Sequence, residues 1–435
     1  MPLIDFANTG KDCSKELQAL LDNRSGEVVL PPGRFIASLE LKNVKDLVLR
    51  GSGRNATTIQ SGKKNKPALQ VKGLWFSRIQ DLGFAASFGS ECGVLEIDGS
   101  DTQGVQGNTY DNLLIDCQGL NDGVKSKYAM TMCRDKQSNG QGSEQTFINC
   151  HFSGASQACY YQVGYNALNN QFIGGNFQNY TRNGMEIVFG GVHVIGVGFQ
   201  STAGYEQIKN DGWDIKADSG GADDAIVVAG CRTESLRFAK FGGAQPPTIS
   251  SCLQRHAMNP WWANHEYKPN DAIVVDELAT SKTPGSLKLY VAKAAHSSPT
   301  FNADQWQHVP FNVVDTYNGT LSNCYFQIGN VLRRTDSDYV CVEVNGDYAM
   351  TPRDNCILAN TANGPVAVWL CDPQAVTVGH QVRIVRAQDN SHPVTLYSLA
   401  MNNTKTNSGT LTSRKRSVTL QALGGGNIAR RWYVV

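Results

Sequence analysis

The chain has 435 residues with 39 Lys and Arg against 38 Asp and Glu, which is enough material for two or three domains with buried cores. A formal net charge of +1 argues against nucleic acid or an anionic membrane surface as the main partner, because both attract a basic excess. Charged residues make up only 18%, while Gly (43) and Asn (34) are abundant, which disfavours a helical bundle or coiled coil.

The N-terminus, residues 1–12, has neither a basic region nor an apolar segment of signal-peptide type, so we expect synthesis in a cytoplasm without a secretion signal. No apolar stretch reaches the length of a membrane span, so we expect no membrane insertion. The twelve cysteines occur singly, without the CxxC pairs typical of zinc sites. This pattern favours reduced, buried thiols, and we expect no metal and no cofactor.

A recognisable signature opens the chain. It consists of the segment 4–10 (IDFANTG), a short helix predicted over 13–22 with an apolar stripe, and the segment 26–35 (GEVVLPPGRF). This order resembles the start of the pectate-lyase-like superfamily, and the likeness covers residues 1–53. The resemblance implies a right-handed parallel β-helix whose open end is covered by the helix.

Short repeated stretches follow, in which an apolar alternation leads to Cys or Phe and then to Gly or Asn. Alignment on an inner Ile gives steps of 36, 33, 25 and 22 residues between Ile79, Ile115, Ile148, Ile173 and Ile195. A minimum near 22 with variable additions is typical of a solenoid whose loops grow at the turns. Inner positions should then stack in ladders, with Asn at the bends and with Cys117, Cys150, Cys231, Cys252 and Cys324 at equivalent places. A β-sandwich or propeller is the alternative.

Composition changes near residue 260, because the segment 260–309 contains three of the seven Trp. Its order of aromatic residues resembles the small chitin-binding type of carbohydrate-binding module. The coil pattern resumes afterwards, which indicates an insertion. The resemblance implies that Trp261, Trp262 and Tyr267 stack on sugar, whereas Trp306 is expected in the core.

The last ninety residues contain alternating strands separated by Asn, Gly and Pro turns. Their order resembles the C-terminal β-domain of phage tailspikes and tail fibres. We therefore predict an all-β protein: a right-handed parallel β-helix over 1–259 and 310–345, a small β module over 260–309, and a β-sandwich-like domain over 346–435.

No short catalytic motif indicates the reaction. A β-helix exposes long sheets that suit an extended polymer, and glycosidic hydrolysis needs two carboxyl groups about 5–10 Å apart. The densest group of suitable residues lies in 204–234, where a loop is expected to protrude. The predicted catalytic carboxylates are Glu206, Asp211, Asp214 and Glu234. The predicted substrate contacts from the β-helix are Tyr205, Trp213, Arg232 and Glu186, with Glu186 expected to stack near Glu234.

Structural roles are the alternative for each of these residues: the Asp residues could make turns, and Arg232 could form an inter-coil salt bridge with Glu234. A second candidate loop, 122–144, contains Lys125, Lys127 and Arg134 and could bind an acidic polysaccharide. A lyase is a further alternative, because Lys209, Tyr205, His193 and Arg232 could supply the cation and base for β-elimination. No cluster of three Asp residues suggests a bridging calcium.

Taken together, these resemblances predict a tailspike-like depolymerase that binds and hydrolyses a bacterial surface polysaccharide. The different-class alternative is a non-catalytic receptor-binding tail protein. The expected assembly is a homotrimer in a virion tail, attached through another tail protein.

Overall fold

A computed structural model describes residues 7–22, 25–99, 104–134, 142–164, 166–202, 204–217, 226–242, 247–256, 263–269, 271–276, 287–309, 314–316, 320–322, 324–328, 331–336, 339–350, 354, 356–371, 381–388, 391–398, 406–412, 417–423 and 431–434. The chain forms two compact units, one of residues 1–257 and 311–320, the other of residues 258–310 and 321–435. Among the helices described, none is long and apolar enough to cross a membrane.

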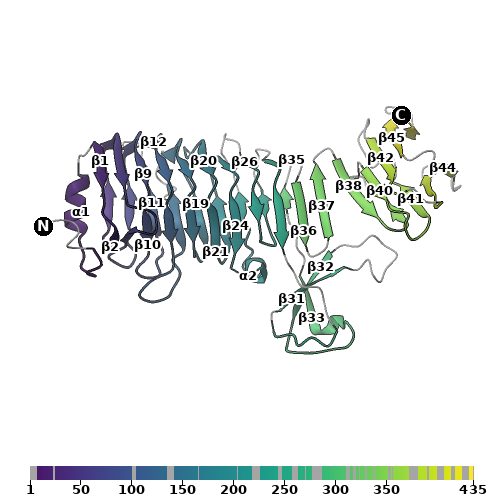
Figure 1. The fold of residues 1–435 in the computed structure, drawn as a ribbon, viewed down its shortest axis with the longest axis horizontal. Helices are drawn as coiled ribbons and strands as arrows, with labels where there is room; N and C mark the ends of the chain where they lie inside the picture. Colours follow the sequence, from purple (N-terminus) through teal and green to yellow (C-terminus); the bar gives the residue numbers. More distant parts are fainter. Residues whose placement is uncertain are drawn as a thin grey trace. The chain divides into compact units, whose positions relative to one another are not determined.

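The first unit is a right-handed parallel β-helix, as predicted, and its strands follow one another along the stack (Figure 1). Each coil contributes one strand to each of three parallel sheets. Sheet A contains β2 (Gly33–Ile36), β6 (Thr57–Gln60), β10 (Gly83–Ala85), β14 (Leu114–Asp116), β18 (His151–Ser153), β21 (Asn176–Tyr180), β24 (Gly198–Ser201), β27 (Arg232–Thr233) and β30 (Leu253–His256). Sheet B contains β1 (Gly26–Val29), β5 (Leu47–Arg50), β9 (Arg78–Gln80), β13 (Thr109–Asp111), β17 (Thr146–Ile148), β20 (Asn170–Ile173), β23 (Val192–Ile195), β26 (Ile226–Ala229) and β29 (Thr248–Ser250).

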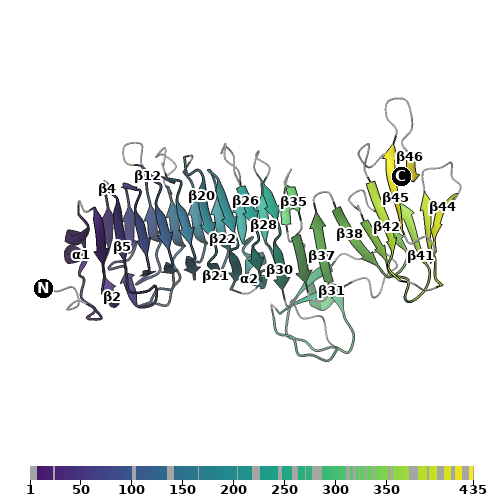
Figure 2. The same cartoon turned by 45° about the horizontal axis from the view of Figure 1, so that its top comes forward.

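Sheet C lies next in each coil and contains β3 (Leu39–Leu41), β7 (Leu69–Val71), β11 (Gly93–Ile97), β15 (Tyr128–Met132), β19 (Ala158–Gln162), β22 (Asn183–Ile187), β25 (Ile215–Ala217), β28 (Ala239–Phe241) and β34 (Val314–Thr316). A short sheet D follows in the first four coils, with β4 (Val44–Lys45), β8 (Leu74–Trp75), β12 (Val105–Gln106) and β16 (Gly142–Ser143). Figure 2 shows β4 and β12 of this sheet along the upper edge. The helix α1 (Ser14–Leu21) lies at the N-terminal end of the stack and buries Leu17 and Leu21, as the capping role requires.

Aromatic ladders fill the interior. In sheet B, Phe147 stacks between Tyr110 and Phe172, with ring centroids 4.7 and 4.6 Å apart. In sheet A, Phe177 stacks between Phe152 and Phe199, at 4.6 and 5.3 Å. Because parallel strands in register place equivalent side chains one strand spacing apart, each coil continues the stack of the previous one.

The predicted Ile ladder is wrong in register. The inward row of sheet B is Ile79, Tyr110, Phe147, Phe172, Val194, Val228 and Ile249, at steps of 31, 37, 25, 22, 34 and 21 residues. Ile173 and Ile195 point outward and are 38% and 42% exposed, and Ile115 belongs to sheet A. A shift of one residue in the alignment exchanges the inward and outward side chains of a strand. Because both faces of these strands carry apolar residues, the sequence pattern did not reveal the shift.

The bends explain the abundance of Asn and Gly. At the bend between sheets B and A, successive coils place Asp81, Asn112, Asn149, Gly174, Gly196, Gly230 and Ser251 at φ between 51° and 64°. Glycine tolerates this left-handed conformation best, and Asn and Asp tolerate it better than most other residues do. The sequence prediction that these residues populate the bends is confirmed.

Cysteines recur at one position of this same bend. Cys150, Cys231 and Cys252 are buried, and each thiol donates to the carbonyl oxygen two residues earlier, at 3.3–3.5 Å. Cys324, the first residue of β36 (Cys324–Ile328), likewise comes two residues after the end of a strand of sheet B, β35 (Thr320–Ser322), whereas Cys117 follows β14 at the next bend. The predicted equivalence therefore fails for Cys117 alone. Eleven cysteines have described side chains; none of these forms a disulfide, and ten of them are buried.

The second unit contains two kinds of β structure. A three-stranded antiparallel sheet joins β31 (Ala272–Asp276), β32 (Leu287–Ala292) and β33 (Trp306–Val309), the last preceded by the 3₁₀ turn η3 (Ala303–Gln305). The C-terminal strands lie in two sheets, of which the first has the same sheet assignment as sheet A, and they share a core that includes Ile357, Ile384, Val368 and Leu396. One contains β36, β37 (Val331–Asp336), β38 (Tyr339–Val344), β40 (Cys356–Ala359), β42 (Gln381–Arg386), β45 (Ser417–Leu423) and β46 (Arg431–Val434). The other contains β39 (Tyr348–Ala349), β41 (Val366–Leu370), β43 (Val394–Ser398) and β44 (Thr406–Leu411).

Candidate functional site

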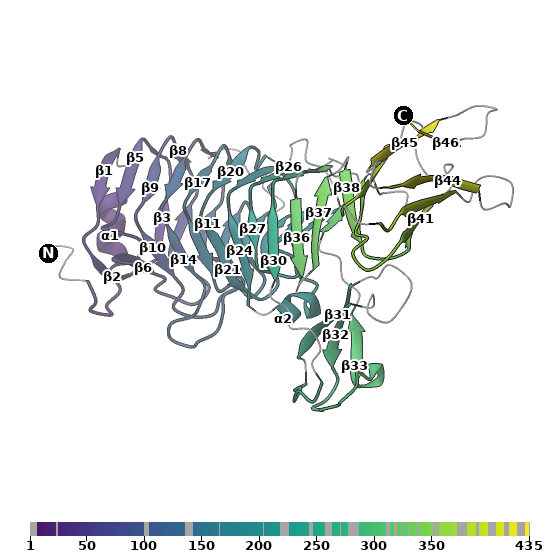
Figure 3. The same cartoon turned by 45° about the vertical axis from the view of Figure 1, so that its right-hand side comes forward.

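The segment 204–217, where a protruding catalytic loop was expected, instead packs partly into the protein. It begins with the short helix α2 (Gly204–Lys209), which Figure 3 shows beside the strands of sheet A. Ile208 of this helix and Trp213 after it are 7% and 3% exposed. The side chains of Tyr205 and Glu206 lie outside the described residues. The loop therefore offers less accessible surface than the sequence suggested.

Asp214 is fully buried and bonded by residues of several elements. Its carboxylate accepts hydrogen bonds from the hydroxyls of Tyr180 and Thr233 and from Gln207 Nε2 at 2.9 Å. Burial raises the pKa of Asp214 to about 6, against the opposing effect of these donors. With no exposed surface, this carboxylate cannot contact a glycan, and its position indicates a structural role in place of the predicted catalytic one.

Asp211 and Glu234 are exposed but engaged with arginines. Asp211 Oδ1 lies 3.1 Å from Arg237 Nη1, and Glu234 Oε1 lies 2.6 Å from Arg232 Nη2. Glu234 also accepts a hydrogen bond from Gln200 at 3.2 Å, on the outer face of sheet A. The Arg232–Glu234 pair lies within one coil, because both residues belong to the same strand end. None of the described contacts joins two of the predicted catalytic carboxylates.

The remaining predicted contacts lie in separate places. Glu186 belongs to β22 of sheet C, whereas Glu234 follows β27 of sheet A, so the expected stacking of these two residues does not occur. Trp213 is buried beneath Arg237, whose guanidinium lies 5.0 Å from the ring centroid. Tyr267 is 5% exposed and packs against Trp306, at 4.8 Å, so it serves as core and presents no free ring face. Trp306 is buried as predicted, and Trp261 and Trp262 lie outside the described residues.

A different surface combines aromatic and charged side chains. The segment 122–144, predicted as one loop, contains strand β15, with Lys127 directly before Tyr128 at its start and Arg134 just after its end. We call this surface the tyrosine face; it consists of Glu91, Glu96, Lys127, Tyr128, Arg134, Tyr161 and Glu186 on the outer side of sheet C and its flanking turns.

Tyr128 and Tyr161 form the centre of the tyrosine face. Their rings stack with centroids 4.7 Å apart and planes inclined by 21°, and both residues are half-buried. Partial burial raises the pKa of both hydroxyls, and the nearby Glu186 carboxylate raises them further. Both phenols are therefore neutral at physiological pH, able to donate and accept hydrogen bonds but poorly suited to act as bases.

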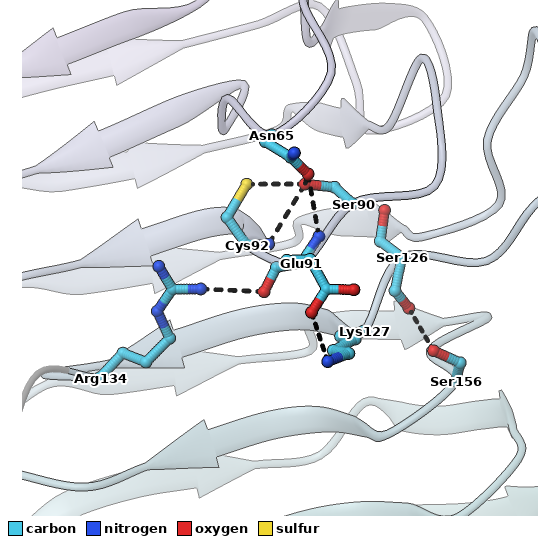
Figure 4. Close-up of polar contacts among 8 residues, drawn as sticks. All are labelled: Asn65, Ser90, Glu91, Cys92, Ser126, Lys127, Arg134 and Ser156. Atoms are coloured by element: carbon cyan, nitrogen blue, oxygen red, sulfur yellow. Dashed lines mark hydrogen bonds and ion pairs between the residues drawn. The ribbon is translucent and has the colours of Figure 1, made fainter.

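Charged groups surround these rings. The backbone carbonyl of Glu91 accepts from Arg134 Nη1 at 2.9 Å, and the Glu91 carboxylate pairs with Lys127 (Figure 4). Arg134 Nη2 also lies 3.7 Å from Glu96 Oε1. On the other side, Glu186 accepts hydrogen bonds from Asn183 at 2.8 Å and Gln157 at 3.2 Å. Carboxylates thus flank both ends of the tyrosine stack, with the two cations at the Glu91 end and amide side chains at the Glu186 end.

The strand register fixes the separation of the two carboxylates that share an outward row. Glu96, Thr131, Tyr161 and Glu186 are aligned on four consecutive strands of sheet C. Three strand spacings correspond to about 14 Å between the ends of this row. Because hydrolysis requires about 5–10 Å between the two carboxyl groups, Glu96 and Glu186 do not form such a pair.

Burial raises the pKa of Glu96, which is 7% exposed, while Arg134 opposes this effect. The backbone N–H of Gly93 donates to this carboxylate at 3.1 Å. Glu96 therefore lies beneath the surface and pairs with the exposed Arg134. The described residues contain no group of three or more His, Cys, Asp or Glu that could hold a metal ion.

The sequence had pointed to Lys127, Arg134 and Glu186 separately, but not to the two tyrosines. Tyr128 and Tyr161 lie 33 residues apart in neighbouring coils. Alignment of the sheet C strands would not have paired them, because the register places Ala158 opposite Tyr128 and Thr131 opposite Tyr161.

Comparisons with known proteins identify no family. No family model and no curated protein matches the chain. One similar solved structure is ORF18 of Geobacillus virus E2, at 14% identity and TM-score 0.34, covering 77% of this chain and 84% of that one. Another is PfbA, a surface adhesin of Streptococcus pneumoniae, at 10% identity and TM-score 0.33, covering 100% and 97%. A third is the A-module of mannuronan C-5 epimerase AlgE4 of Azotobacter vinelandii, at 11% and 0.25, covering 85% and 93%. Identities and TM-scores this low do not indicate a function.

Proposed function

We propose that this protein binds a bacterial surface polysaccharide along the outer side of its β-helix, with the tyrosine face as the contact. The observation that supports this proposal is the half-exposed stack of Tyr128 and Tyr161 between charged groups. The C–H face of a pyranose packs against an aromatic ring, while its hydroxyls need donors and acceptors at the rim. Arg134 and Lys127 supply donors, and Glu186 supplies an acceptor.

The repeat of the fold supports a polymer as the ligand. Parallel strands repeat every 4.7–4.9 Å or so along the axis of a solenoid, a distance comparable to the length of one sugar unit. Outward side chains on successive strands are therefore spaced to meet successive sugars of an extended chain. A small ligand would gain nothing from this repetition.

Hydrolysis by a tailspike-like depolymerase is the more specific proposal. The described geometry supports it less than it supports polysaccharide binding. Asp214 is buried, Asp211 and Glu234 are engaged with arginines, and the Glu96–Glu186 separation is too long for a catalytic pair. A lyase is the other catalytic alternative. The raised pKa values of Tyr128 and Tyr161 oppose its need for a ready base.

The assembly and location stay proposals. The resemblance of the last ninety residues to tail-fibre domains supports a homotrimer in a phage virion tail, attached through another tail protein. Sedimentation equilibrium of the full chain tests the trimer, and a stable monomer at micromolar concentration would contradict it.

Binding is tested with a panel of purified bacterial capsular polysaccharides and exopolysaccharides, with alginate, hyaluronan and dextran as defined members. We expect wild-type protein to bind at least one member, and Tyr161→Ala to weaken that binding about threefold to tenfold, the effect of one aromatic contact. Tyr161→Phe, which keeps the ring, is the matched control and should retain most of the affinity.

The same incubations separate the catalytic alternatives. New reducing ends without unsaturated products would indicate hydrolysis, unsaturated products would indicate a lyase, and binding with neither would indicate a receptor-binding protein. If the wild-type chain binds no member of the panel, or if Tyr161→Ala binds as wild type does, the proposed role of the tyrosine face is wrong.

A further inference from the structure

A second aromatic surface lies at the corner that follows sheet D. Phe76 is 59% exposed, the largest exposed fraction among the large hydrophobic side chains of the described residues. Trp75, immediately before it, is half-buried on the outer side of β8, between Lys45 and Gln106 in the neighbouring strands. We call Trp75 and Phe76 the corner aromatics.

Phe76 adopts a backbone conformation that disfavours its own side chain. Five consecutive coils place a residue at φ between 50° and 66° at this corner: Asp46, Phe76, Gly107, Glu144 and Asn169. The corner therefore requires left-handed backbone, which Gly, Asn and Asp adopt most readily and a bulky residue rarely does. Phe is the one aromatic residue among these five.

The next coil accommodates the ring. A Cβ atom added to Gly107 would lie only 2.9 Å from Phe76 Cδ1, so the ring rests against a position that has no side chain. Lys45 Nζ lies 5.7 Å from the ring centroid on the other side. Although both neighbours contact it, more than half of the side chain stays in solvent.

Two unfavourable features coincide here, a strained backbone and an exposed ring. Strain of this kind persists where the surrounding structure enforces it, and it concentrates at functional sites. Charged and amide residues occupy the same corner in the neighbouring coils. Lys45 and Asp46 belong to the preceding coil, Gln106 to the next and Glu144 to the one after it, and Gln106 Nε2 donates to Glu144 Oε2 at 3.0 Å.

This surrounding composition identifies the class of ligand. The centre of a protein–protein interface is depleted of charged residues, so charges of both signs close to a single exposed ring disfavour a second protein chain. A pyranose matches the arrangement, because it needs one apolar ring to stack on and polar groups at its edge.

We propose that the corner aromatics form a second glycan subsite, in which one sugar stacks on Phe76 and hydrogen-bonds to Lys45 or Glu144. This inference rests on the proposed function, since it takes the same class of ligand. The subsite is separate from the tyrosine face: Phe76 ends the second coil after sheet D, whereas Tyr128 and Tyr161 lie on sheet C of the fourth and fifth coils.

The test uses Phe76→Asn in the full chain, because Asn removes the ring and also suits the left-handed backbone. We expect its thermal unfolding midpoint to equal or exceed that of wild type, while its affinity falls about threefold to tenfold. The probe is the panel polysaccharide that wild type binds. A side chain retained for stability alone would give the opposite result, a lower midpoint with unchanged affinity, and would overturn the inference.

Two further variants keep the outcome interpretable. Leu120→Ala removes another exposed apolar side chain, 44% exposed, in the turn between β14 and β15, and should not change the affinity. Tyr161→Ala reports the tyrosine face separately. If Tyr161→Ala weakens binding and Phe76→Asn does not, the second subsite is wrong and the proposed function stands; if wild type binds no polysaccharide, both fall.

Discussion

Replacement of Asp214 by Asn tests whether this carboxyl group is structural, with an expectation that follows from its burial. In the folded protein, burial raises its pKa from 3.8 to about 6. The folded state therefore binds the proton more tightly than the unfolded state does. The contribution of this group to the free energy of unfolding is fully present below pH 4, where the carboxyl group is protonated, and it is lost as the pH rises through about 6.

The size of this effect follows from the shift. A difference of about two pKa units corresponds to about 3 kcal/mol between the protonated and ionised forms. Asn resembles the protonated carboxyl group: its Oδ1 can accept from Tyr180 and Gln207, and its amide can donate to the hydroxyl of Thr233. We expect Asp214→Asn to be close to wild type in stability at pH 4 and up to about 3 kcal/mol more stable at pH 7.

The assay is urea unfolding of the full chain at pH 4, 5, 6 and 7, followed by tryptophan fluorescence, since Trp213 is buried next to the substitution. Asp211→Asn is the control, because its ion pair with Arg237 is exposed on the aspartate side and such pairs contribute at most about 1 kcal/mol. The reasoning is wrong if Asp214→Asn destabilises the protein and does so more strongly at pH 7 than at pH 4. That result would mean that the ionised carboxylate stabilises the fold.

Three further changes test the packing of the β-helix. Phe172→Ala removes a ring that is 1% exposed and stacked at 4.6 Å; we expect a loss of about 3–5 kcal/mol in urea unfolding, and a loss below 1 kcal/mol would contradict the ladder. Gly175→Ala would place a Cβ atom 2.1 Å from the carbonyl oxygen of Cys150 at φ 78°, so it should lower the thermal midpoint more than the same change at the open Gly196. Lys125→Met removes a donor to Asn179 O at 2.7 Å and Thr202 Oγ1 at 3.2 Å; faster amide hydrogen exchange around residues 179–202 is the expected result, and unchanged exchange would show that these bonds do not hold the coils together.

The outcome for the cysteines illustrates how far composition could lead. Single spacing without CxxC pairs predicted buried, reduced thiols, and among the eleven cysteines whose side chains are described, ten are buried and none forms a disulfide. The reason for their positions needed coordinates. At the bend between sheets B and A, this position turns inward beside a backbone carbonyl, and Leu82, Leu113 and Val197 occupy it in other coils. A thiol at the same position fills part of that space and also donates a weak hydrogen bond, as Cys150, Cys231 and Cys252 do.

The sequence by itself determined the solenoid, its capping helix and the Asn and Gly at its bends, because those features depend on local conformation and on a repeated pattern. It could not determine which face of each strand points outward, since Ile173 and Ile195 are apolar yet exposed. The residues of the candidate site depend on which face of each strand points outward. Whether Asp214 is buried, whether Glu186 meets Glu234, and whether Tyr128 meets Tyr161 are consequences of strand register between coils of unequal length, and only the tertiary structure decides them.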